Sequence, residues 1–437
     1  MSDADGKSGE SLREVRILDG LVLGIDLRNN YSEVSCCREN MVIDSVGTDN
    51  DSHGLIPTVI CKKKGEDSWY IGEEAYRLAL FGGGTMVDQL LKLSAKNGFA
   101  TIEGVRYEAG ELLKIYISSL LSLAKARFGS EEIRCLMFTV AEMNAAFMDY
   151  LVDVSEELGI PRDRVHIQSH CESFVSYVVR QQPEIWANTA SLFDLTDEGL
   201  TYYEMRVIRG RKPHIAEAVR QPLEESFSLD VMDTPQGKRL ADSIMTTCAG
   251  KLFGKKVISS VFLTGKGFLT WDWAESFKRV VCAKRRCYTG QQLFSGGAAY
   301  AAFDISKNRP SYPFICICEG RIACTVTLNA LLDGRTEQVV LALAGTNWYE
   351  ARSNVDLIVD DMDEIVLSAS SVGSPLPQKF TIPLGQLPAR PNRTTRIGLS
   401  LVFSSEKDFT VRVIDKGFGD LFPASNTVIR RDFYLMG

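Results

Sequence analysis

Strand patterns and helix patterns alternate between residues 107 and 196, and this alternation limits the possible folds more than any other feature of the chain. The segment Tyr107–Gly129 repeats apolar residues at helical spacing and ends in glycine, which is typical of an amphipathic helix. The near-continuous apolar run Glu132–Val140 indicates a strand that is covered on both faces. Because the same order continues, we expect an α/β core with right-handed crossovers. The further predicted elements are a helix over 144–158, a strand over 164–169, a helix over 172–180 and a strand over 190–196.

The last part of the chain has a different pattern. Helical periodicity disappears after about residue 303, and runs with a period of two residues take its place, separated by turn residues. These runs predict a β-sandwich-like second domain. They are FICICEG, IACTVTL, EQVVLALAG, EIVLSAS, RIGLSLVF and FTVRVID. The predicted division is a flexible tail over 1–16, an α/β domain over 17–303 and a β-sandwich-like domain over 304–437.

Charge and cysteine spacing narrow the function classes. A net charge of −7 argues against a sequence-independent nucleic-acid surface, which requires a basic face. We interpret the basic run Lys278–Arg286 as a solvated helix face. The eleven cysteines lack the spacing of a zinc site, and neither a signal peptide nor an apolar run of ~18 residues is present. We therefore expect no membrane or nucleic-acid partner and a cytoplasmic location.

Two segments have the pattern of a strand, a polar turn and a returning strand. The first is LVLGIDLRNNYSEVSC (residues 21–36), whose turn carries Arg28, Asn29 and Asn30. The second is LFDLTDEGLTYYEM (residues 192–205). Such hairpins can hold phosphate groups when their turns offer backbone N–H groups and small side chains.

The order of these segments resembles the superfamily of actin, hexokinase and heat-shock ATPases. The closest likeness is to the nucleotide-binding domain of the seventy-kilodalton heat-shock chaperones, over residues 20–302. Each segment is a weak signal alone, but their common order supports the resemblance. Besides the two hairpins, the segments that carry it are IPTVICKKKGEDSWYIGEEA, LMFTVAEMNAAFMDYLVDVSEELGI, HCESFVSYVV, VFLTGKGF and SGGAAYAA.

This resemblance implies a two-lobed actin-like fold, with ribonuclease-H-like lobes, and ATP with magnesium held between the two hairpins. Asp26 and Asp194 would hold the metal. Glu172 would orient the attacking water, and Lys92 matches the family's catalytic lysine. The implied nucleotide contacts are Asp26, Arg28, Asn29, Asn30, Gly199, Gly265, Lys266 and Gly267. The alternatives that stay open are strand-end caps for the aspartates, a helix-dipole carboxylate for Glu172, a surface lysine for Lys92 and a tight turn at the glycine pair.

The chain departs from the family pattern at both phosphate loops. Arg28 stands where the family has glycine, so it either bonds a phosphate or fills the phosphate space. The second loop carries Asp197 and Glu198, which would repel phosphate by about 4 kcal/mol at an effective dielectric of ~20 and 4 Å. We therefore expect weak ATP hydrolysis at most. The short segment 195–262 also indicates a trimmed second lobe, with a helix over 234–254 as its remnant.

Together these features predict a chaperone-like or scaffold protein. A degenerate ATP-binding domain would be coupled to a β-sandwich that binds a partner or client protein. The loops of that domain that are rich in proline, glycine and asparagine are Leu387–Arg396 and Asp415–Asn426. They are either a partner site or only turns. Two alternatives remain: an active ATPase or small-molecule kinase of the same superfamily, and an actin-like filament-forming protein.

Overall fold

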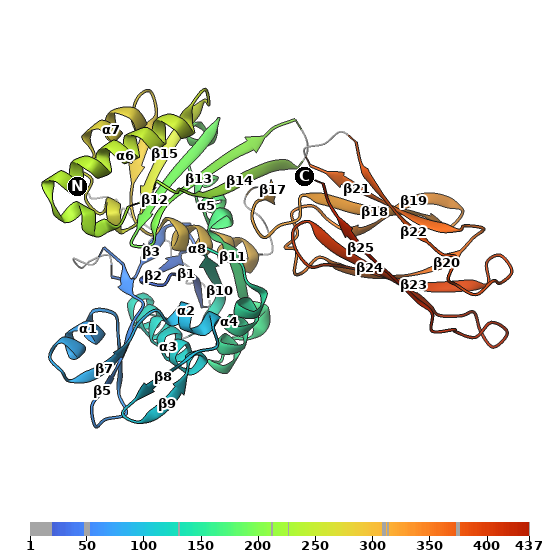
Figure 1. Cartoon of the computed structure of the whole chain (residues 1–437), viewed down its shortest axis with the longest axis horizontal. Helices are drawn as coiled ribbons and strands as arrows, with labels where there is room; N and C mark the ends of the chain where they lie inside the picture. The colour runs from blue at the N-terminus through green and yellow to red at the C-terminus, as the bar shows by residue number, and fades with distance from the viewer. Residues whose placement is uncertain are drawn as a thin grey trace, which may run out of the picture.

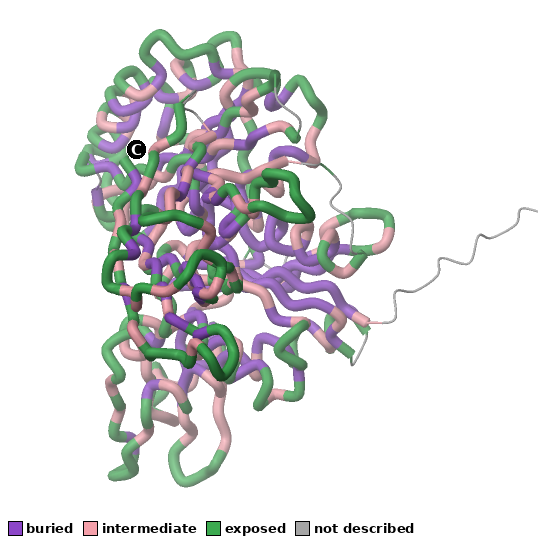
Figure 2. The backbone as a smooth tube through the Cα atoms, turned by 90° about the vertical axis from the view of Figure 1, so that its right-hand side faces the viewer, coloured by how far each residue is buried: buried purple, intermediate pink, exposed green. Residues whose placement is uncertain are grey.

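The computed structural model describes residues 20–47, 53–129, 132–210, 213–225, 227–307, 312, 314–372 and 376–436. The predicted tail over 1–16 lies outside these residues. The fold is mixed α/β, and its C-terminal region consists mostly of β strands (Figure 1). Figure 2 shows that the buried parts of the chain lie in the interior, whereas the outer loops are exposed.

The first lobe is built on a sheet with the strand order β3-β2-β1-β10-β11. Its first three strands are antiparallel, whereas β10 and β11 run parallel to β1. Helices α3 and α4 pack on one face of this sheet, where Leu23, Ile25 and Phe138 enter the largest core. The bounds are Leu21–Leu27 (β1), Tyr31–Cys37 (β2), Ile43–Ser45 (β3), Ile133–Val140 (β10), Val165–Ser169 (β11), Ala109–Phe128 (α3) and Ala145–Glu157 (α4), with Ile56–Pro57 (β4) paired to β2.

The second lobe repeats this arrangement. Its sheet has the order β14-β13-β12-β15-β16, again with three antiparallel strands followed by two parallel ones. Helices α6 and α7 cover one face, where Phe193, Leu195 and Leu263 are buried. The bounds are Thr189–Thr196 (β12), Gly199–Ile208 (β13), His214–Pro222 (β14), Ile258–Thr264 (β15), Arg286–Thr289 (β16), Pro235–Phe253 (α6) and Glu275–Val281 (α7).

Two helices connect the lobes at their inner faces. Helix α5 (His170–Val178) packs in the core of the second lobe, whereas α8 (Leu293–Ser306) packs on the sheet of the first. Small residues allow a very close approach, because a Cβ on Gly24 would lie 2.1 Å from the Ser295 carbonyl oxygen and one on Gly297 would lie 2.0 Å from the Ser173 carbonyl oxygen. Packing therefore accounts for Gly297 of the SGGAAYAA segment, whereas a Cβ on Gly296 would make only ordinary contacts at 3.6 Å.

A small subdomain extends from the first lobe (Figure 1). It contains a three-stranded sheet of order β6-β5-β7, a two-stranded β8-β9 hairpin and two short helices. The bounds are Ile60–Lys63 (β5), Trp69–Ile71 (β6), Gly72–Leu80 (α1), Gly84–Val87 (β7), Leu90–Ala95 (α2), Phe99–Ile102 (β8) and Val105–Glu108 (β9).

The C-terminal region is a sandwich of two four-stranded antiparallel sheets, β19-β18-β21-β22 and β20-β23-β24-β25. Alternate residues of both sheets, such as Val326, Leu399 and Val411, share one buried core. The bounds are Cys324–Leu332 (β18), Arg335–Ala342 (β19), Arg352–Val359 (β20), Glu364–Ser371 (β21), Gln378–Pro383 (β22), Thr395–Phe403 (β23), Asp408–Asp415 (β24) and Val428–Tyr434 (β25).

One strand assigned to the sandwich from sequence belongs elsewhere. The FICICEG run forms β17 (Phe314–Ile317), which pairs in parallel with β14 and extends the sheet of the second lobe. The prediction for this run was wrong because period-two alternation marks a strand but does not name its partner. The first sandwich strand is β18, so the sandwich begins after residue 317 rather than at 304.

Among the helices of the described residues, none combines the length and the apolar character that a membrane crossing requires.

The close approach of α8 to β1 leads to a stability prediction. Gly24→Ala should lower the free energy of unfolding by about 1–3 kcal/mol, because the added methyl group collides with the α8 backbone. Gly250→Ala is the matched control, since nothing beyond the backbone of its own helix lies within 4 Å of a Cβ there and alanine favours the helix by about 0.5–1 kcal/mol. Urea unfolding of both variants measures the difference. Equal midpoints would contradict the packing described for α8.

Candidate functional site

Two β-hairpins bring buried aspartates together between the lobes. Asp26 lies near the end of β1, and Asp194 lies near the end of β12. The register of each hairpin is set by the residues between its last paired positions, 28–31 in the first lobe and 197–198 in the second. The structure therefore places the two carboxylates at equivalent points of the two lobes, facing one side chain, Arg28.

The guanidinium of Arg28 fills the space between these aspartates. Its Nε donates to Asp26 Oδ2 at 2.8 Å, and its Nη1 donates to Asp194 Oδ2 at 2.8 Å. The rings of Tyr31 and Phe294 lie 5.1 and 5.0 Å from the guanidinium carbon, within cation–π distance. Only 9% of the Arg28 side chain is exposed. The guanidinium is therefore engaged by protein groups from both lobes.

His170 completes the group, which we call the cleft cluster (Asp26, Arg28, His170 and Asp194). It is the first residue of α5, and its Nε2 donates to Asp26 Oδ1 at 2.7 Å. Its ring stacks on Phe294 with centroids 4.1 Å apart, and its Nδ1 lies 3.3 Å from the Tyr203 hydroxyl. Both oxygens of Asp26 are therefore occupied by protein donors.

The two aspartates differ electrostatically although both contact Arg28. At Asp26, burial alone would raise the pKa, but Arg28 and His170 together hold it below its ordinary value. At Asp194, burial outweighs the opposing effects of Arg28 and His170 and raises the pKa. The second oxygen of Asp194, Oδ1, is also buried without a hydrogen-bond partner. The difference follows from the number of donors, since Asp26 has two strong partners and Asp194 has one.

A third buried acid lies beside the cluster. Glu33 is directly opposite Asp26 in the β1–β2 hairpin and is only 2% exposed. Burial, reinforced by the neighbouring Asp26 charge, raises the pKa of Glu33 to about 8. Glu33 is therefore mostly protonated at neutral pH and adds little negative charge to the site.

The hairpin turns contact each other across the cleft. Asn29 Nδ2 donates to Glu198 Oε1 at 2.8 Å, and Lys92 Nζ lies 3.2 Å from the same oxygen. Lys266 Nζ lies 3.3 Å from both carboxylate oxygens of Asp197. Asp197 and Glu198 were expected to repel phosphate. They are paired with Lys266, Asn29 and Lys92, which were expected to contact nucleotide or to act in catalysis. The remaining turn residue, Asn30, accepts a backbone hydrogen bond from Thr58 at 3.1 Å.

Backbone conformation and close packing explain the glycines of the predicted nucleotide site. Gly265 has a φ of +92°, and a Cβ there would lie 2.4 Å from the Leu195 carbonyl oxygen. A Cβ on Gly267 would lie 2.4 Å from the Leu195 side chain. Gly199 has a φ of +120° at the start of β13. Tight turns and close packing therefore account for all three positions without a ligand.

The two remaining predicted catalytic residues do not reach the aspartates. Glu172 caps α5 with Ser169, and its Oε1 accepts from Arg321 Nε at 2.7 Å. Lys92 pairs with Glu198, and its side chain is 52% exposed. In the part of the chain that is described, neither group contacts the cleft cluster.

Sequence reasoning missed His170 and Glu33, although each had a usable signal. Strands β1, β10 and β11 are parallel, so their carboxyl ends meet at one edge of the sheet, and His170 directly follows β11. The four residues 28–31 between the last paired residues of the first hairpin, Leu27 and Ser32, place Glu33 opposite Asp26. Both could have been found by combining the expected topology with the hairpin register.

This arrangement does not fit magnesium with ATP. Three of the four carboxylate oxygens of Asp26 and Asp194 are already bonded by Arg28 and His170. Across the described residues, no group of three or more His, Cys, Asp or Glu side chains could hold a metal ion. A cation could reach the aspartates only if Arg28 moved out.

Two family models match this chain. The model described as the C-terminal part of a family of unknown function (DUF5716) matches residues 43–319, and a domain of unknown function (DUF8552) matches residues 321–435. The two matches meet between β17 and β18, where the second lobe ends and the sandwich begins. A search of curated proteins found no match.

The raised pKa of Glu33 predicts a specific pH dependence. The folded state keeps this proton up to about pH 8, whereas the unfolded chain releases it near the ordinary value of 4.5. The resulting stabilisation is complete below pH 4.5 and is lost as the pH rises towards 8. Glu33→Gln cannot ionise, so its free energy of unfolding relative to the wild type should rise by a few kcal/mol between pH 5 and 8.5, since one pKa unit corresponds to about 1.36 kcal/mol.

Urea unfolding at several pH values measures this difference. Glu73→Gln, at an exposed position of α1, is the control and should follow the wild type at every pH. A Glu33→Gln curve parallel to the wild type would show that Glu33 is ionised in the folded protein.

Proposed function

The chain belongs to the family of unknown function DUF5716, and we propose that it is a chaperone-like or scaffold protein whose actin-like domain has exchanged nucleotide for an internal arginine. In this proposal the two lobes are those of the heat-shock ATPase class. Their shared strand order and the facing aspartates support this reading. The domain would hold its two lobes closed and present a β-sandwich to a partner protein.

The observation that carries the proposal is the bridge from Arg28 to Asp26 and Asp194. A guanidinium between two carboxylates supplies the positive charge that a bound metal would otherwise supply. Expelling it breaks a buried ion pair, which costs about 3–5 kcal/mol. Because each factor of ten in affinity is worth about 1.4 kcal/mol, the bridge would weaken binding of magnesium and ATP by about 10²- to 10⁴-fold. An active ATPase or kinase would need both aspartates free.

The cleft and the sandwich are connected through one helical turn. His170 and Glu172 both lie in the first turn of α5. His170 bonds Asp26 in the cleft, whereas Glu172 pairs with Arg321, just before the first sandwich strand. Arg321 also donates to the Gly345 carbonyl in the segment after β19. A change at the cleft cluster would therefore displace a residue that anchors the sandwich.

The sandwich offers a rigid surface for a partner. The loops 387–396 and 415–426 are joined by Arg390, which donates to both oxygens of Asp415 at 2.7 Å. This guanidinium holds the pKa of Asp415 well below its ordinary value. The fixed loop exposes Phe418 and Leu421, the latter by 88%. Preordered apolar side chains of this kind favour protein binding, because little conformational entropy is lost.

The eleven cysteines, all free of disulfides, support the cytoplasmic location that we propose.

The experiment is a thermal-shift and calorimetric titration with magnesium and ATP. The wild type should show no saturable binding and no hydrolysis above background, because Arg28 occupies the metal position. Arg28→Gly should be destabilised and then stabilised by magnesium ions. Arg28→Gly combined with Asp194→Asn should lose that response, because one carboxylate is gone.

Arg38→Gly is the matched control. Its guanidinium bonds Asp44 at an exposed position, so neither stability nor magnesium response should change much. Saturable binding of magnesium and ATP by the wild type, with turnover, would overturn the proposal.

A further inference from the structure

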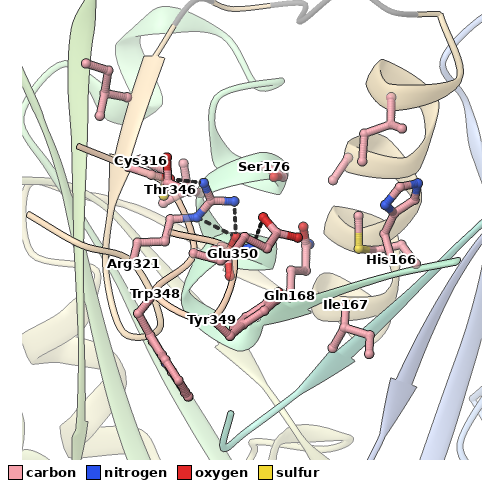
Figure 3. Close-up of a pocket in the computed structure, with 18 of the residues that line it drawn as sticks. His166, Ile167, Gln168, Ser176, Cys316, Arg321, Thr346, Trp348, Tyr349 and Glu350 are labelled. Atoms are coloured by element: carbon pink, nitrogen blue, oxygen red, sulfur yellow. Dashed lines mark hydrogen bonds and ion pairs between the residues drawn. The ribbon is translucent and has the colours of Figure 1, made fainter. Parts of the chain in front are cut away.

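A cavity of about 1140 Å³ lies between the first lobe, the second lobe and the sandwich (Figure 3). Its lining includes Met148 and Val152 from α4, Ile305 from α8 and Phe314 from β17. This volume exceeds the range of about 300–1,000 Å³ that is usual for small-molecule pockets. The cavity is separate from the cleft cluster and from the exposed sandwich loops.

The cavity contains the free edge of a sheet. Strand β11 is the outermost strand of the first lobe, and within the described residues no strand pairs with its outer edge. Val165, His166, Ile167 and Gln168 all line the cavity. Because successive residues of a strand point to opposite faces, four in a row can line one cavity only if it surrounds the strand edge. The unpaired backbone groups of that edge are a template for another strand.

The strand on the opposite wall of the cavity has no free edge for pairing. The outer edge of β17 also lines the cavity, but the segment around Gly345 lies against it. A Cβ on Gly345 would lie 2.7 Å from Ile315 Cγ2 and 3.3 Å from the Cys316 carbonyl oxygen. Figure 3 shows Arg321, Trp348 and Tyr349 on this side and the β11 side chains on the other. The vacant pairing position is therefore the edge of β11.

Two buried polar atoms in the lining lack partners. Asn347 is only 8% exposed, and its Oδ1 has no hydrogen-bond partner. His166 Nε2 is also buried without a partner. Buried polar groups in proteins are nearly always satisfied by protein or by ordered water, so these two atoms are available to an occupant with hydrogen-bonding groups.

We propose that this cavity binds an extended peptide segment of a partner protein, which adds as a strand to the free edge of β11. A strand rises about 3.3 Å per residue, so the five residues of β11 can pair with a segment of about 17 Å. Main-chain hydrogen bonds would supply affinity, and the apolar walls would select side chains at alternate positions.

The charges of the lining specify the peptide further. Arg180 is paired with Asp304, and Arg321 is paired with Glu172. In the described structure, the charged side chains of the lining that have no ion pair are Asp149, Glu350 and Arg352. Two carboxylates and one guanidinium without ion pairs favour a peptide with at least one basic side chain. The apolar residues of the lining favour apolar side chains at alternate positions of that peptide. Between three parts of the molecule, a single extended strand fits the edge of β11 with less obstruction than a folded second copy of this chain.

The test uses the full chain and a phage-displayed library of random dodecapeptides. The most enriched peptide is then synthesised with a fluorescent label and titrated by anisotropy. Ser176→Trp places a large side chain in the cavity from α5 and should weaken binding at least tenfold. Ala145→Trp does the same from the exposed start of α4, where folding is not at risk. Ser122→Trp, on the exposed face of α3, is the matched control and should bind like the wild type.

Amide hydrogen exchange locates the peptide. Bound peptide should slow exchange in residues 165–169, and the enriched sequences should alternate apolar residues and include Lys or Arg. The proposal is overturned if no peptide is enriched, if both cavity variants bind normally, or if β11 is not protected. It is also overturned if the peptide-free chain is a dimer that Ala145→Trp dissociates, because the occupant would then be a second copy. None of these readouts depends on whether the cleft binds nucleotide.

Discussion

The buried contact of Arg28 with Asp26 and Asp194 joins the hairpins of the two lobes. A single guanidinium joins carboxylates from two different hairpins. Arg28 and Asp194 are 166 residues apart in the sequence. Taking three charged groups out of water is costly, and mutual attraction offsets that cost only when the geometry is good. The 2.8 Å contacts, the aromatic rings and the His170 bond provide this geometry. Removing one partner would leave an unpaired charge buried between the lobes.

The same contact links the cleft to the rest of the molecule. His170 and Glu172 connect it through α5 to Arg321, while β17 extends the second sheet towards the sandwich. In our account the domain is a fixed support rather than a nucleotide-driven switch. A population shift would require a ligand with different affinities for two states, and in our proposal Arg28 takes the place of that ligand.

Local pattern predicted much of the fold, whereas the site depended on contacts that pattern does not encode. The helix at Tyr107–Gly129 and the strand at Glu132–Val140 appear as α3 and β10 within two residues, because apolar spacing and a terminal glycine are local signals. No local signal in the sequence indicated that β17 pairs with β14 or that the two lobes share one strand order. Asp26 and Asp194 were expected to face each other only by resemblance, and residues on either side of Arg28 did not indicate that its side chain bridges both. The chemistry of a buried cation depends on neighbours that are distant in sequence.

A double-mutant cycle between Arg28→Met and Asp194→Asn tests the central claim most directly. If Arg28 bridges the lobes, the two substitutions should be strongly coupled in the free energy of unfolding, by at least about 2 kcal/mol, as for other close buried charge pairs. The exposed pair Arg38 and Asp44 gives the reference cycle, for which about 0.2–1 kcal/mol is expected. A coupling for Arg28 and Asp194 no larger than this reference would contradict the account.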